Sequence, residues 1–80
     1  GSVSVEARCR GRVARGVMLQ MWTHHEAFSS GRGKHHLEAN EVPAGPALIE
    51  VRRGFELVGT KTILVQPGVL TSETIEVELK

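Results

Sequence analysis

Apolar and polar residues alternate with a period of two in several separate stretches of this 80-residue chain. Successive side chains of a β-strand point to opposite faces, so this period predicts strands that bury one face. The stretches are residues 3–10, 17–22, 47–52, 62–65 and 74–80, with a weaker one at 34–39. In 17–22 the alternate positions include Met18 and Trp22, so we expect that strand to be covered on both faces. No helix-period segment of ten residues accompanies these stretches, and we expect an all-β chain.

Glycine and proline separate these stretches at short intervals. Gly supplies positive φ and Pro fixes φ near −65°, so such residues mark turns between strands. The turn pairs include Arg10-Gly11, Arg15-Gly16, Arg53-Gly54 and Pro67-Gly68. Strands spaced in this way predict an antiparallel β-sandwich of about six or seven strands. We expect the segment 23–33 to be a long hairpin loop.

The size and composition of the chain fit one small folded domain. A content of 40% hydrophobic and 24% charged residues is ordinary for a globular domain, and the net charge of +1 argues against disorder. No apolar run approaches the roughly 20 residues that a membrane span needs. We expect residues 3–80 to form a single β-sandwich domain, and Gly1-Ser2 to be the scar that tag cleavage leaves during cloning.

The chain has one cysteine and no aspartate. A single cysteine, Cys9, rules out an internal disulfide framework and a Cys-based zinc cluster, and it leaves the compartment open. Its alternation with Val5 and Ala7 favours a buried small hydrophobe over a reactive thiol. The absence of Asp argues against the usual calcium loops and excludes a Ser-His-Asp arrangement. We expect no enzymatic activity and no cofactor.

A specific run of turns and strands occupies residues 41–79. It begins with an apolar-Pro-x-Gly turn at 42–45 and a strand that ends in Gly-aromatic at 47–55. A strand that ends in a Gly turn follows at 60–68, and a closing strand at 74–79. The run resembles that of the carboxypeptidase regulatory-like domains, which have a transthyretin-like (prealbumin-like) β-sandwich. Gly11-Arg12-Val13 and residues 16–19 lie where the family places its first two strands. In such a sandwich Phe55 falls where an aromatic ring can plug one end.

The resemblance implies a non-catalytic accessory domain. In the family, such domains are appended to peptidases, hydrolases, transport receptors and surface proteins. A narrower likeness, at residues 43–56, is to the small β-domain that precedes the metal-dependent hydrolase domain of some bacterial enzymes. We therefore expect a module that scaffolds or orients neighbouring domains of a larger protein. Open sheet edges could also accept a partner strand or a second copy, giving a homodimer.

Four histidines, His24-His25 and His35-His36, lie within thirteen residues. Imidazole suits zinc, copper and nickel, and two strands flanking a hairpin could bring the pairs together. Adjacent residues on a strand point to opposite faces, so each pair offers one ligand to a given site, with Glu26 or Glu38 as a third. Two alternatives stay open: a ligand-binding module in which residues 23–36 hold a metal or an anionic group, and solvated loop histidines.

Basic residues gather in the first half of the chain. Residues 1–36 carry six Lys or Arg against two Glu, whereas 37–80 carry four against seven. By period two, Arg8, Arg10 and Arg12 lie on one strand face and form a candidate binding face for phosphate or carboxylate groups. The alternative is a solvated strand face paired with Glu residues of a neighbouring strand. Single-strand binders add several stacking aromatics, and only Trp22 is available, so we expect no nucleic-acid partner.

Overall fold

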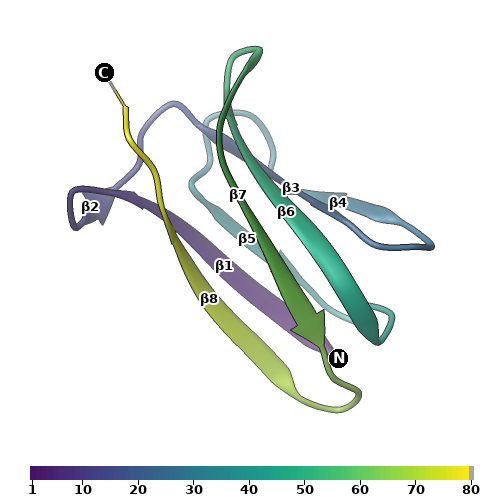
Figure 1. The fold of residues 1–80 in the computed structure, drawn as a ribbon. Coiled ribbons are helices and arrows are strands. Elements are labelled where there is room, and N and C mark those ends of the chain that lie inside the picture. Colours follow the sequence, from purple (N-terminus) through teal and green to yellow (C-terminus); the bar gives the residue numbers. More distant parts are fainter. Residues whose placement is uncertain (80) are drawn as a thin grey trace.

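The computed structural model describes residues 1–79, which form eight β-strands in two sheets packed face to face (Figure 1). The prediction of an all-β sandwich is confirmed. Sheet A contains β1 (Ser2–Cys9), β2 (Arg12–Val13), β5 (His36–Ala39) and β8 (Leu70–Glu76). Sheet B contains β3 (Met18–Trp22), β4 (Ala27–Ser29), β6 (Gly45–Arg53) and β7 (Glu56–Val65). Nowhere in the described chain is there a helix long and apolar enough to cross a membrane.

The first strand, β1, is the centre of sheet A. β8, the last strand, runs parallel to β1 along one edge, from the pair Ser2↔Leu70 to the pair Arg8↔Glu76. The other edge is shared by β5 and β2, both antiparallel to β1. The sheet therefore joins the two ends of the chain through one parallel pair, while every other strand pair among the described residues is antiparallel.

Sheet B has the strand order β4-β3-β6-β7, with all neighbours antiparallel. The β6–β7 hairpin is its longest unit. It turns through Gly54 and Phe55, and Gly54 has a φ of 63°, a value that suits glycine at the first position of a two-residue hairpin turn. A β-bulge between Val51 and Arg52 shifts the pairing near this turn. Such a bulge bends the strand and increases its twist at that point.

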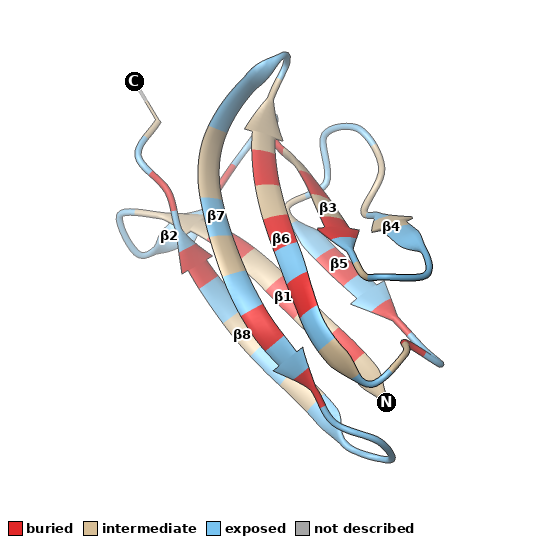
Figure 2. Ribbon diagram, turned by 45° about the vertical axis from the view of Figure 1, so that its right-hand side comes forward, coloured by how far each residue is buried: buried red, intermediate tan, exposed pale blue. Residues whose placement is uncertain are grey.

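The core lies between the sheets and is entirely aliphatic apart from methionine. Alternate residues of the strands are buried, which Figure 2 shows as red bands recurring along the ribbon. This confirms the predicted inward faces of the strands at 3–10, 17–22 and 47–52. None of the described residues with a polar or charged side chain is buried. The buried residues are Val3, Val5, Ala7, Ala14, Val17, Leu19, Met21, Leu37, Ala39, Val42, Ala47, Ile49, Val51, Ile63, Val65, Ile75 and Val77.

The two sheets approach each other at β7 and β8 without a fully apolar seam. Gly59 of β7 lies so close to the chain after β8 that a Cβ atom there would be 2.7 Å from Cγ1 of Val77. Farther along, Lys61 stands opposite the buried Ile49, and Glu73 stands opposite the buried Val5. Nζ of Lys61 and Oε2 of Glu73 are 3.2 Å apart. An ion pair between inward positions therefore bridges this side of the sandwich.

Several strands are longer or begin elsewhere than the sequence predicted, because they continue past the stretch of apolar alternation. β7 begins at Glu56 rather than at residue 62, because Gly59 and Lys61 occupy inward positions where the pattern predicted apolar residues. β8 begins at Leu70 and ends at Glu76, where residues 74–80 were expected, because it follows β1 from Ser2 onward. Ser2, which we expected to lie outside the domain, is the first residue of β1. The segment 23–33, predicted as one loop, contains β4.

Candidate functional site

The outer faces of the two sheets differ in chemistry. On sheet A the central outward pairs are polar, as in Ser4↔Ser72 and Glu6↔Thr74, and the exposed apolar residues Val13 and Leu70 lie apart, paired with opposite ends of β1. On sheet B the outward positions are Met18, Gln20, Trp22, Pro46, Leu48, Glu50, Arg52, Thr60, Thr62 and Leu64; we call this set the outer face of sheet B. Its large apolar side chains are exposed in part, Trp22 by 45%, Leu48 by 39% and Leu64 by 60%. The outer face of sheet B is therefore the candidate functional site.

The apolar residues of this face are neighbours. The register places Leu48 of β6 directly opposite Trp22 of β3 and opposite Thr62 of β7. The next outward pair along the hairpin is Pro46↔Leu64. A shallow hollow of about 330 Å³ lies beside Trp22 and Leu48 and is also lined by Pro46 and Thr62. The result is a continuous apolar area at one end of the face.

Glu50 lies at the centre of the face and holds both of its neighbours. Its Oε1 accepts a hydrogen bond of 2.7 Å from Nε1 of Trp22, and its Oε2 is 3.3 Å from Nη2 of Arg52. Only 16% of the Glu50 side chain is exposed. Both carboxylate oxygens are therefore engaged, and the hydrogen bond fixes the orientation of the Trp22 ring.

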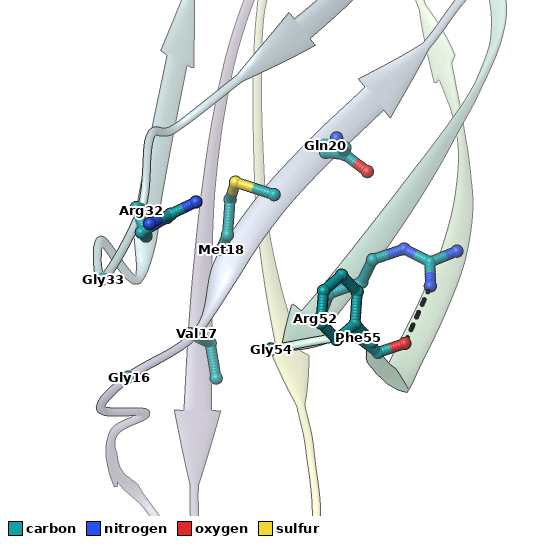
Figure 3. A pocket seen from close by; sticks show the side chains of 9 residues that line it. All are labelled: Gly16, Val17, Met18, Gln20, Arg32, Gly33, Arg52, Gly54 and Phe55. Carbon is teal, nitrogen blue, oxygen red and sulfur yellow. Dashed lines mark hydrogen bonds between the residues drawn. The ribbon is translucent and has the colours of Figure 1, made fainter.

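A larger pocket, of about 670 Å³, opens at the other end of the face (Figure 3). Its floor is the start of β3, and its rim comes from residues 16–17, 32–33 and 54–55 of three connections between strands. We call this the terminal pocket. It is lined by Gly16, Val17, Met18, Gln20, Arg32, Gly33, Arg52, Gly54 and Phe55.

The terminal pocket combines cationic and apolar side chains. Arg32 is exposed and has no hydrogen bond or ion pair with another described residue. Arg52, partly buried, donates from Nη1 to the Phe55 carbonyl oxygen at 3.5 Å. Figure 3 shows Met18 between Arg32 on one side and Arg52 with Phe55 on the other. Among the described residues that line the pocket, none is acidic, so the lining favours a ligand with an anionic group.

Phe55 does not plug an end of the sandwich, and that prediction is wrong. Its side chain is fully exposed, at 103% of the reference area. The reason is the β6–β7 turn: Phe55 is a turn residue beyond the last paired positions, Arg53 and Glu56. The ring therefore projects past the sheet and contributes to the rim of the terminal pocket.

The structure does not bring the histidine pairs together as the metal hypothesis requires. His24 and His25 form the tip of the β3–β4 turn, which Thr23 Oγ1 closes by accepting hydrogen bonds from the backbone nitrogens of His25 and Glu26. His35 and His36 lie at the start of β5 in the other sheet. In residues 1–79, no three His, Cys, Asp or Glu side chains are grouped so as to hold a metal ion.

Individual histidines instead have local contacts. Nε2 of His36 lies 2.8 Å from the Ser4 hydroxyl and 3.8 Å from Oε1 of Glu38 on the polar outer face of sheet A. The carbonyl oxygen of His35 accepts a hydrogen bond of 2.8 Å from the Ala7 backbone nitrogen. These contacts link β5 to β1, so this pair has a structural part in sheet A.

Arg8, Arg10 and Arg12 do not share a strand face, and this premise of the arginine hypothesis is wrong. β1 ends at Cys9, and Arg10 and Gly11 form a turn with φ values of 55° and 76°. The register pairs Arg8 with Val13 and Cys9 with Arg12, so Arg8 and Arg12 point to opposite faces. Arg8 also has local partners: Nε is 3.2 Å from Oε1 of Glu6, and Nη1 donates to the Gly11 carbonyl.

The sequence interpretation named several residues of the candidate site without placing them together. Met18 and Trp22 stand at outward positions of a strand that we expected to be covered on both faces. The described residues cover this outer side only in part: Met18 is half-buried, and Trp22 stays exposed. For the terminal pocket, the predicted anion-binding segment 23–36 contains Arg32, but no pattern joins Arg32 to Arg52 and Phe55, which come from another hairpin.

No protein-family model and no curated protein matches this chain. The relation to carboxypeptidase regulatory-like domains therefore stays a prediction.

Proposed function

We propose that this chain is a non-catalytic interaction module that packs against a neighbouring protein domain through the outer face of sheet B. The observation that carries the proposal is the exposed pair Trp22 and Leu48, opposite each other on adjacent strands. A transthyretin-like accessory domain, as the sequence resemblance implies, would have the same role. The module would orient its neighbour by presenting a rigid sheet rather than a loop.

The arrangement of Trp22 suits a binding contact. Tryptophan is enriched among the residues that contribute most to protein interfaces, since its large ring buries much apolar area. The hydrogen bond to Glu50 holds the ring before a partner arrives. Less conformational freedom then has to be lost on association, which favours tighter binding.

The outer face is a better docking surface than the open strand edges. β7 and β8 carry inward-pointing charged residues, Lys61 and Glu73, a feature that opposes pairing with another strand. β4, at the other edge of sheet B, has only three residues, Ala27–Ser29. A homodimer through sheet edges stays a prediction, and we assign the principal contact to the face.

The test is site-specific photo-crosslinking in the cells that make the protein. A photoreactive amino acid replaces Leu48 on sheet B or, as a matched control, Ser72 on the outer face of sheet A; both positions are exposed strand residues. We expect one discrete product from position 48 and none from position 72. The partner is then purified, and its binding to wild type, Leu48→Glu and Ser72→Glu is measured. Leu48→Glu should abolish binding, whereas Ser72→Glu should preserve it.

The opposite pattern would overturn the proposal. Crosslinks from position 72 alone would assign the interaction to sheet A. Equal binding by Leu48→Glu and wild type would show that the face is not the contact surface. Both substitutions lie at exposed positions, so each variant should retain the fold. Amide correlation spectra of the two variants check this.

One observation favours a second candidate function, a ligand-binding module that uses residues 23–36 to hold an anionic group. Arg32 and Gly33 of that segment line the terminal pocket together with Arg52. Loss of anion binding in Arg32→Gln, measured by calorimetry with inorganic phosphate or acetate, tests this function. An unchanged heat of binding in that variant would exclude Arg32 from such a role.

A further inference from the structure

We infer that the terminal pocket recognises an acidic peptide segment of the partner, in which a carboxylate lies next to an aromatic or aliphatic side chain. The inference rests on the proposed function, since it names the chemistry of what docks at one end of the outer face of sheet B. It goes beyond that function because it assigns specificity to Arg32 and Phe55, which lie at the rim of the face.

The cationic half of the pocket is Arg32, with Arg52 across from it. A guanidinium group can donate two parallel hydrogen bonds to a carboxylate, and the exposed Arg32 has no competing partner among the described residues. Arg52 is held by Glu50 and by the Phe55 carbonyl. Arg52 is therefore held at a fixed place with its charge offset by Glu50, and Arg32 supplies the main cationic contact for the ligand.

The apolar half of the pocket is formed by Phe55 and Met18. Phe55 presents its whole ring to solvent, and Met18 forms the floor between the two arginines. A thioether and an aromatic ring together accommodate apolar side chains of varied shape. Gly16, Gly33 and Gly54 contribute no side chains to the rim, so a peptide main chain can approach the backbone there.

The surroundings favour a polypeptide over a nucleic acid or a lipid surface. A phosphodiester chain that continued along the face would meet the carboxylate of Glu50. Single-strand binders also require several stacking aromatics along a cationic groove, and this face has Trp22 and Phe55 at opposite ends. The site is a hollow of about 670 Å³, which suits an inserted side chain better than a flat membrane surface.

The first experiment is selection from a display library of short random peptides on immobilised wild-type protein. We expect enrichment of Asp or Glu adjacent to Phe, Trp, Leu or Ile. The same selection on an Arg32→Glu/Arg52→Glu variant should enrich Lys or Arg instead. Absence of any enriched peptide, or acidic enrichment that persists on the variant, would overturn the inference.

The second experiment measures the affinity of a selected peptide by fluorescence polarisation. Removal of a charge-assisted contact weakens binding by about tenfold or more, so Arg32→Gln should have that effect and Phe55→Ser a comparable one. Arg12→Gln is the matched control, because Arg12 is an exposed arginine of β2 outside the pocket. Unchanged affinity in Arg32→Gln, or an equal loss in Arg12→Gln, would contradict the assignment.

Competing ligands are tested with the same variants. The competitors are an oligothymidylate and phosphatidylserine vesicles. If either binds, and Arg32→Gln weakens its binding as strongly as it weakens peptide binding, the inference of a peptide ligand is wrong and that ligand class takes its place. Failure of this inference can be distinguished from failure of the proposed function. If selected peptides depend on Trp22 and Leu48 but not on Arg32, the inference is wrong and the interaction face stands. If the crosslinking experiment excludes Leu48 while peptides still require Arg32, the pocket binds peptides independently of the face.

Discussion

The indole nitrogen of Trp22 donates a hydrogen bond of 2.7 Å to Oε1 of Glu50, across the exposed surface of two adjacent strands. Tryptophan at a partly exposed position usually has rotational freedom, and here a carboxylate removes much of it. The same carboxylate contacts Arg52 through its other oxygen. Glu50 thus connects the apolar end of the face to the terminal pocket.

Substitution of Glu50 by Ala should release the Trp22 ring. Trp22 is the only tryptophan, so its fluorescence reports on this contact directly. We expect an emission maximum at longer wavelength and a lower anisotropy. Water can replace the lost partner at this surface, so the free energy of unfolding should fall by only about 1 kcal/mol. Glu56→Ala, an exposed glutamate of β7, is the control; identical spectra for both variants would contradict the role of Glu50.

Gly59→Ala should destabilise the fold, because the new Cβ would lie 2.7 Å from Cγ1 of the buried Val77. Valine has few alternative rotamers, and overpacking of this kind costs about 1–3 kcal/mol. In a Val77→Ala background the same substitution should cost less, since the clashing methyl group is gone. Urea unfolding of the four proteins of this double-mutant cycle measures the coupling. An equal cost of Gly59→Ala in both backgrounds would rule out this contact as the cause.

Lys61→Val should promote self-association with little change in stability. The Lys61–Glu73 pair is partly exposed, and such pairs contribute about 0–1 kcal/mol. The inward charge, however, opposes pairing of β7 with another strand. Sedimentation velocity should therefore show dimers or larger species for Lys61→Val. Thr74→Val, which adds an apolar side chain at an exposed outward position of the edge strand β8, is the control. A monomeric Lys61→Val protein would refute this role of the charge.

Equimolar zinc should leave most amide resonances of the protein unchanged. His24-His25 lie in the β3–β4 turn of sheet B, whereas His35-His36 lie at the beginning of β5 in sheet A, and closed zinc sites need three or four ligands. Amide correlation spectra with and without zinc provide the measurement, with His35→Ala/His36→Ala as the comparison. Saturable shifts at both histidine pairs, abolished in that variant, would restore the metal hypothesis.

Most of the sheet could be predicted from the sequence because burial of one strand face leaves a period of two. Val3, Val5 and Ala7 on β1, and Leu19 and Met21 on β3, lie in the core as the alternation predicts. The turns were also marked, since the positive φ of Gly11 and Gly54 favours the residue type that the sequence shows. These features are local, so the residues that specify them are adjacent in the chain.

The pairing of strands and the composition of the site were decided by tertiary structure. The parallel contact of β8 with β1 brings together the two ends of the chain, and no local pattern specifies it. The pairing of β2 with β1 beyond the Arg10-Gly11 turn places Arg8 and Arg12 on opposite faces, although period two alone would have aligned them. Arg32, Arg52 and Phe55 meet only because three connections between strands end at the same side of sheet B. Local spacing determines strands and turns, whereas long-range packing determines which exposed side chains become neighbours.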